Sequence, residues 1–97
     1  MVGLVKSKLK LKEGQVEHVV NFGALGYGVD LMARILDLPE KSILGAMGDA
    51  GSEFCRAYEK GEAMAGYRID QKLLEMAQGG DIKALNELEK RGKLSGS

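Results

Sequence analysis

The chain has 97 residues, enough for one domain with a modest hydrophobic core. Hydrophobic residues make up 44% and charged residues 29%, which is typical of a folded globular protein and excludes a disordered one. One cysteine and one histidine exclude an internal disulfide and the usual zinc sites, and the apolar runs are too short for a secretory signal or a membrane span. We therefore expect a cytoplasmic protein without metal or cofactor.

Basic residues are concentrated at the amino terminus, although 14 basic and 14 acidic residues cancel overall. Residues 1–12 contain Lys6, Lys8, Lys10 and Lys12 and no acidic residue. The period of two lines these lysines along one side of an extended chain, whereas a helix would scatter them. One interpretation is a solvated, flexible terminus, and the other is a basic arm that lies along a DNA backbone or in a groove.

Two short helices are predicted next, over residues 13–24 and 29–36. The first has an apolar face at helical spacing, formed by Val16, Val19, Val20 and Ala24. Glycines at 23, 26 and 28 indicate a turn between the two helices.

A third helix is predicted over residues 39–47, because Pro39 disfavours helix at Leu38 and suits the first turn of a new helix. A fourth and longer helix is predicted over residues 52–77, with Ser52 as its N-cap.

Gly79 and Gly80 end the fourth helix, and Asp81 is placed to cap a fifth helix over residues 82–91. The tight glycine turn would fold the fifth helix back against the fourth as an antiparallel hairpin. The predicted fold is all-α: an arm at residues 1–12, a three-helix unit with helix-turn-helix character at 13–51, a helical hairpin at 52–92 and a disordered tail at 93–97.

Three segments resemble phage terminase small subunits and related phage helix-turn-helix proteins. The first is the run GYGVDLMARILDLPEKSI from Gly26 to Ile43, the second is FCRAYEKG from Phe54 to Gly61, and the third is MAQGGDIKAL from Met76 to Leu85. Together they keep the order and spacing of the family's motifs over roughly residues 15 to 92.

This resemblance implies a function in DNA packaging. In that family the small subunit binds viral DNA through a helix-turn-helix, assembles into a ring and passes the DNA to the terminase large subunit. The resemblance implies that residues 39–47 form the reading helix, that residues 52–91 mediate assembly, and that the protein, from a phage or a prophage, acts in the cytoplasm of a bacterial host.

The candidate DNA-binding residues outside the arm are Arg34, Lys41 and Ser42. Lys41 and Ser42 lie at the start of the predicted reading helix, where the helix amino terminus also favours phosphate. A lysine at this position is equally an ordinary solvated residue. Arg34 is placed to reach a backbone phosphate or to pair with Asp30 four residues earlier.

The fourth helix has a long apolar stripe, which starts at Phe54. A helix of 26 residues spans roughly 39 Å, longer than a compact domain of this size needs. Core packing and self-association therefore both remain open for this stripe. The candidate oligomerisation residues are Tyr58, Ala65, Ile69, Leu73 and Met76.

Two other functions compete with a DNA-binding packaging protein. Leu44, Gly45 and Ala46 in the reading helix offer little polar chemistry to base edges, which favours a protein-interaction or scaffold module of the same fold. A phage-type transcriptional regulator would be expected to have a more polar reading helix. We do not expect an enzyme, since His18 has no partner group for acid–base chemistry.

Overall fold

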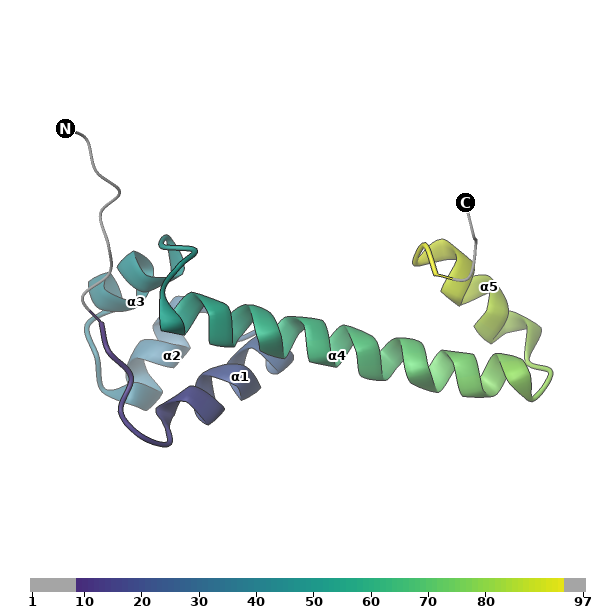
Figure 1. Cartoon of the computed structure of the whole chain (residues 1–97), viewed down its shortest axis with the longest axis horizontal. Helices are drawn as coiled ribbons and strands as arrows, with labels where there is room; N and C mark the ends of the chain where they lie inside the picture. The colour runs from purple at the N-terminus through teal and green to yellow at the C-terminus, as the bar shows by residue number, and fades with distance from the viewer. Residues whose placement is uncertain (1–8, 94–97) are drawn as a thin grey trace. The chain divides into compact units, whose positions relative to one another are not determined.

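The computed structural model describes residues 9–93, and these residues form an all-α fold, as predicted (Figure 1). The helix boundaries agree with the sequence-based expectation to within two residues. The helices are α1 (Gln15–Leu25), α2 (Val29–Leu36), α3 (Glu40–Met47), α4 (Glu53–Gln78) and α5 (Ile82–Lys90).

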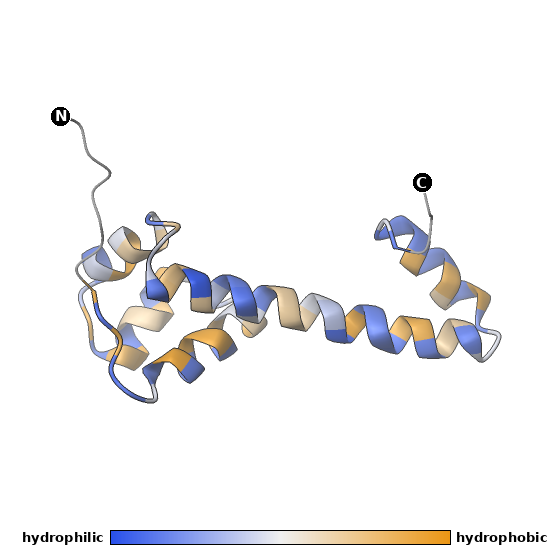
Figure 2. Cartoon of the chain, viewed as in Figure 1, coloured by the Kyte–Doolittle hydropathy of each residue, from blue (hydrophilic) through white to orange (hydrophobic). Residues whose placement is uncertain are grey.

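The chain divides into two compact units, residues 1–63 and 64–97, and the division falls within α4. The first unit contains α1, α2, α3 and the first part of α4. Figure 2 shows orange, hydrophobic residues dense along α1 and α2, whereas α4 is largely blue or pale. The core of the first unit draws on all four helices and comprises Val19, Phe22, Met32, Ala33, Ile43, Ala46, Phe54 and Ala57.

The helices α1 and α4 approach each other at two glycines. A Cβ atom placed on Gly23 would lie 1.9 Å from the Tyr58 carbonyl oxygen, and one on Gly61 would lie 1.8 Å from the Val20 carbonyl oxygen. Because the obstructing atoms are backbone, only glycine permits this separation. We expected Gly23 in the turn after the first helix, and this was wrong: Gly23 is buried inside α1 as a packing residue.

The turn between α1 and α2 is held against α4. The Tyr58 hydroxyl donates a hydrogen bond to the Tyr27 carbonyl oxygen at 2.8 Å. The Tyr27 ring stacks on Phe22 with a centroid separation of 5.7 Å. These contacts position the start of α2 on the first unit's core.

Ser52 joins the end of α3 to the start of α4. Its buried hydroxyl donates to the Ala46 carbonyl oxygen at 2.7 Å and accepts from the Cys55 backbone N–H at 3.0 Å. The predicted N-cap is therefore confirmed, and the same hydroxyl also satisfies a carbonyl near the end of α3.

The second unit contains residues 64–78 of α4 and the whole of α5. Gly80 adopts φ 100°, a left-handed conformation that suits glycine, and reverses the chain between the two helices. The Asp81 carboxylate accepts the Ala84 backbone N–H at 3.1 Å and caps α5, as predicted. Among the described side chains of this unit, only Ala84 and Leu88 are buried hydrophobics.

No helix within residues 9–93 qualifies as a membrane span, since even α4 lacks a sufficiently hydrophobic window.

Candidate nucleic-acid interface

A turn of three residues, Asp37 to Pro39, separates α2 from α3. Asp37 ends α2 in the left-handed conformation at φ 56°, which aspartate tolerates better than most residues. The Leu38 N–H donates to the Ala33 carbonyl oxygen at 3.0 Å. Pro39 then adopts an extended conformation as the N-cap of α3, so this helix begins at Glu40 and not at the proline. The two short helices are thus distinct and closely packed.

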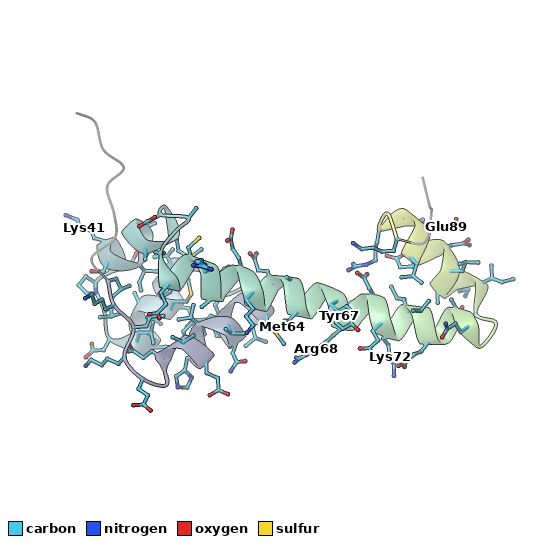
Figure 3. The ribbon with its side chains drawn as sticks, in the orientation of Figure 1. Lys41, Met64, Tyr67, Arg68, Lys72 and Glu89 are labelled. Carbon is cyan, nitrogen blue, oxygen red and sulfur yellow. The ribbon has the colours of Figure 1, made fainter. Side chains whose placement is uncertain are left out.

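The inner and outer sides of α3 differ sharply in burial. Ile43 and Ala46 are buried in the core and hold the helix against the first unit. On the other side, Lys41, Leu44 and Gly45 are exposed, and Leu44 retains 57% of its accessible surface. Figure 3 shows Lys41 projecting away from the helix. The outer side of α3 is therefore free of cover by the described part of the chain.

The other two predicted DNA-binding residues near α3, Ser42 and Arg34, differ in exposure. Ser42 is half-buried beside Ile43, so it contributes less surface than the sequence suggested. Arg34 is exposed in the last turn of α2. The structure thus leaves Arg34 and Lys41 as exposed cations on the two helices that flank the turn.

The amino-terminal segment lies against the first unit where it is described. Leu9 and Leu11 pack on the hydrophobic core, whereas Lys10 and Lys12 are exposed. The Lys12 N–H donates to the Gln15 side-chain oxygen at 2.7 Å, which ties the segment to the first turn of α1. The alternation of leucine and lysine therefore directs the lysines outward.

Lys6 and Lys8, the other two predicted arm contacts, lie outside the described residues.

The helical body of the first unit carries an excess of acidic residues. Between residues 13 and 63 there are nine acidic and four basic side chains. Phosphate is repelled by such a body unless cations are concentrated at one place. In the first unit, attraction to a polyanion would therefore depend on the amino-terminal lysines, with Arg34, Lys41, Arg56 and Lys60 as the remaining basic side chains.

The five predicted oligomerisation residues fall into two groups. Tyr58 belongs to the first unit and uses its hydroxyl within its own chain. In the second unit, Ala65 and Leu73 are half-buried, while Ile69 and Met76 are exposed. The four residues in the second unit lie at helical spacing on one stripe of α4.

The second unit exposes large hydrophobic side chains outside the predicted stripe. Its exposed large hydrophobics include Tyr67 and Ile82, of which Ile82 is 71% exposed. A first-turn position on a short helix carries little periodicity, so the sequence offered no clear signal for Ile82. In Figure 3, Arg68 and Lys72 project from the side of α4 that faces away from α5.

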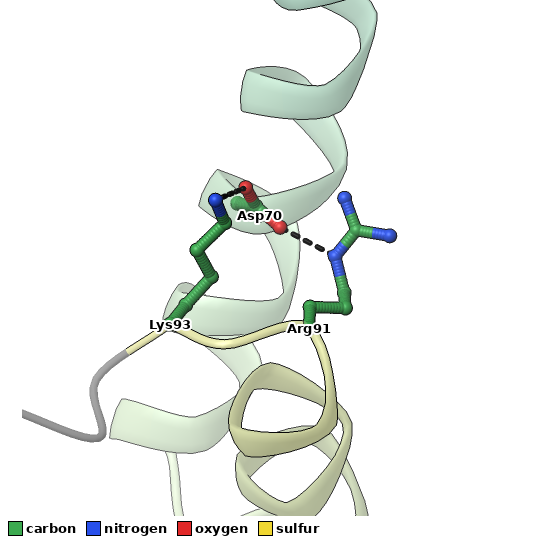
Figure 4. Close-up of polar contacts among 3 residues, drawn as sticks. All are labelled: Asp70, Arg91 and Lys93. Atoms are coloured by element: carbon green, nitrogen blue, oxygen red, sulfur yellow. Dashed lines mark hydrogen bonds and ion pairs between the residues drawn. The ribbon is translucent and has the colours of Figure 1, made fainter. Parts of the chain in front are cut away.

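A shallow groove of about 360 Å³ lies between α4 and α5 in the second unit. Its lining is Tyr67, Asp70, Gln71, Leu74, Leu88 and Lys93. Asp70 accepts a hydrogen bond from the Arg91 side chain at 2.6 Å, and its other oxygen lies 3.9 Å from the Lys93 ammonium (Figure 4). These contacts confirm that α5 folds back on α4, and they leave the apolar floor of the groove open.

The described residues contain no group of side chains suited to hold a metal ion. Within residues 9–93, no three His, Cys, Asp or Glu side chains gather to hold a metal ion. Burial raises the pKa of the Cys55 thiol, and the carboxylates of Glu59, Asp49 and Glu62 act in the same direction. A raised pKa keeps this thiol protonated and unreactive.

No protein-family model matches this sequence, and neither the curated proteins nor the solved structures include a significant match to it.

Proposed function

We propose that this protein binds double-stranded DNA and acts as an oligomer, in the manner of the phage terminase small subunits that its sequence resembles. The observation that carries the proposal is the arrangement of α2 and α3. Two eight-residue helices are joined by a three-residue turn, and the outer side of the second is exposed. A helix-turn-helix requires both features, because its second helix must enter the major groove.

The charge distribution supports different roles in DNA binding for the amino-terminal segment and for α3. The body of the first unit is acidic, so the lysines at 6, 8, 10 and 12 supply the phosphate attraction. Lys41, at the start of α3, adds a cation where the helix dipole also favours phosphate. In this proposal α3 meets the base edges, and the amino-terminal segment follows the backbone.

The second unit supports self-association. Fewer than about 40 residues seldom form a stable fold without a disulfide, a metal or a partner. This unit spans residues 64–97, and its described part buries only Ala84 and Leu88 as hydrophobic side chains. A second copy of the chain would cover the stripe that includes Ile69 and Met76. The assembled protein would then pass DNA to a terminase large subunit.

A second candidate function is a protein-interaction module that does not bind DNA. The observation in its favour is an apolar surface on α2 and α3, where Leu31, Ile35 and Leu44 are all exposed. Together with the acidic body, this surface would suit a protein partner better than a polyanion.

The deciding experiment is a salt titration of binding to a fluorescently labelled duplex, followed by anisotropy. The logarithm of the affinity should fall linearly with the logarithm of the salt concentration, with a slope of about 0.9 for each phosphate contact. Replacing Lys6, Lys8, Lys10 and Lys12 with alanine should reduce that slope and weaken binding at every salt concentration.

A matched control removes the same number of charges elsewhere. The control variant replaces four lysines outside the arm with alanine: Lys60, Lys72, Lys83 and Lys90, all of which are exposed. Its net charge equals that of the arm variant, so a general charge effect would change both slopes alike. Absence of duplex binding at low salt overturns the proposal and favours the interaction module. A single preferred operator-like site would instead favour a transcriptional regulator.

Light scattering tests the assembly. We expect a mass above that of one chain, and we expect Ile69→Asp combined with Met76→Asp to lower it, since charges on that stripe oppose burial. Gln71→Asp combined with Gln78→Asp adds two charges at exposed positions on the opposite side of α4 and should leave the mass unchanged. A wild-type protein that is monomeric at all concentrations would remove assembly from the proposal.

A further inference from the structure

The outer side of α3 has little of the usual polar chemistry for reading bases. Lys41, Leu44, Gly45 and Gly48 follow one another at the spacing of one helix face, and all four are exposed. Arginine, lysine, asparagine and glutamine make most of the specific hydrogen bonds to base edges. Of these, α3 has only Lys41, in its first turn, and its most exposed large hydrophobic residue is Leu44.

The glycine at position 45 is not required by the fold. Gly45 lies inside α3 without a positive φ, and a Cβ atom added to it would meet no neighbour within 4 Å. Alanine would stabilise the helix at such a position. This situation contrasts with Gly23 and Gly61, where the opposing backbone excludes a side chain. Gly45 instead leaves the helix backbone bare beside Leu44, so that an external surface can come close.

We propose that Leu44 recognises the 5-methyl groups of thymine in the major groove, and that Gly45 lets α3 approach closely enough for this contact. The inference rests on the proposed DNA-binding function and names what the interface reads. The thymine methyl is the apolar group that base edges present in the major groove. Leucine set against guanine or cytosine would desolvate their polar edges without replacing the lost hydrogen bonds. Leu44 therefore recognises methyl groups, and the protein favours sequences that contain thymine.

The test changes only the methyl groups of the DNA. Binding of the full chain is compared on a duplex of mixed sequence and on the same duplex with every thymine replaced by uracil. A third duplex carries 5-methylcytosine in place of cytosine. We expect the uracil duplex to bind about fourfold more weakly for each methyl that Leu44 buries. The added methyl groups of 5-methylcytosine should strengthen binding.

Two leucine variants assign the effect to α3. Leu44→Ala removes an exposed side chain and should bind the thymine and uracil duplexes equally. Leu25→Ala, at the end of α1, removes the same group from a position that is 64% exposed, and it should keep the wild-type discrimination. Circular dichroism confirms that both variants retain their helices.

The outcomes separate this inference from the proposed function. Equal binding of wild type to the thymine and uracil duplexes overturns methyl recognition and leaves DNA binding intact. Unchanged discrimination by Leu44→Ala also overturns the inference, because the methyl effect would then arise elsewhere. Failure to bind any of the three duplexes at low salt overturns both the inference and the proposed function.

Discussion

The two units of this chain are stabilised in different ways. In the first unit four helices share a core, and α1 and α4 touch backbone to backbone at Gly23 and Gly61. In the second unit the stabilising contacts lie largely at the ends of α5: the Asp81 cap and the Asp70 ion pairs. The first unit has the interior of an independent domain, whereas the described part of the second unit buries only Ala84 and Leu88 as hydrophobic side chains and leaves apolar surface exposed.

The largest effect is expected where the two helices meet. Gly61→Ala places a methyl group 1.8 Å from the Val20 carbonyl oxygen, so α1 and α4 must separate. We expect a loss of about 3 kcal/mol in the free energy of unfolding, measured by urea denaturation with circular dichroism.

Gly45→Ala is the control for this substitution. The same change at an open helical position should raise the free energy of unfolding by about 0.5–1 kcal/mol. If both variants unfold at the wild-type urea concentration, the tight crossing does not exist in solution.

The two N-caps compare the units directly. Ser52→Ala removes a buried hydroxyl that serves both the Cys55 N–H and the Ala46 carbonyl, and should cost about 2 kcal/mol. Asp81→Ala removes one half-exposed acceptor and should cost about 1 kcal/mol or less, because water replaces it. Thermal unfolding measures both. If Asp81→Ala lost more stability than Ser52→Ala, the second unit and not the first would be the better-packed one.

Alkaline pH tests the burial of the first unit. Burial raises the pKa of the Cys55 thiol above its ordinary value of 9.0, and it also raises the pKa of the Tyr58 hydroxyl. Each group ionises at lower pH in the unfolded chain than in the folded one. Their stabilising contribution is therefore present in full below the unfolded pKa and is lost as pH rises through the folded pKa.

Urea denaturation across the alkaline range should show this loss as a falling free energy of unfolding. Cys55→Ala should make the decline shallower and leave the part due to Tyr58. An identical decline in wild type and Cys55→Ala would show that the thiol is not buried.

The smallest effect is expected at the ion pairs of the second unit. Asp70→Asn weakens the contacts to Arg91 and Lys93, which are partly exposed. We expect a change below about 1 kcal/mol that shrinks further at high salt. Thermal unfolding at two salt concentrations checks this, with Asp81→Asn as a matched removal of charge at the same hairpin. A loss well above this range would make electrostatics the main support of the hairpin.

The sequence predicted the helices well because the signals that start and end them are local. Pro39, the glycines at 79 and 80, and the caps Ser52 and Asp81 act within a few residues of themselves. The period of two in the amino-terminal segment also indicated outward lysines, and Lys10 and Lys12 are exposed. For the candidate interface, Lys41 could be identified from its place at a helix start.

The roles of Gly23 and Ser42 were harder to predict from the sequence. Gly23 sits in a glycine-rich stretch and resembled a turn residue, because the Tyr58 backbone that it packs against is distant in the sequence. Ser42, adjacent to Lys41, turned out to be half-buried, since the direction of a side chain depends on what packs against the helix.

Local chemistry determined where the helices begin and end, since capping groups, proline and glycine act on the backbone beside them. Tertiary structure decided which side of each helix is covered. The apolar stripe of α4 looks uniform in the sequence, yet Phe54 is buried and Ile69 is exposed. The physical reason is that a side chain is buried only where other helices pack over it, and only the tertiary structure specifies where they pack.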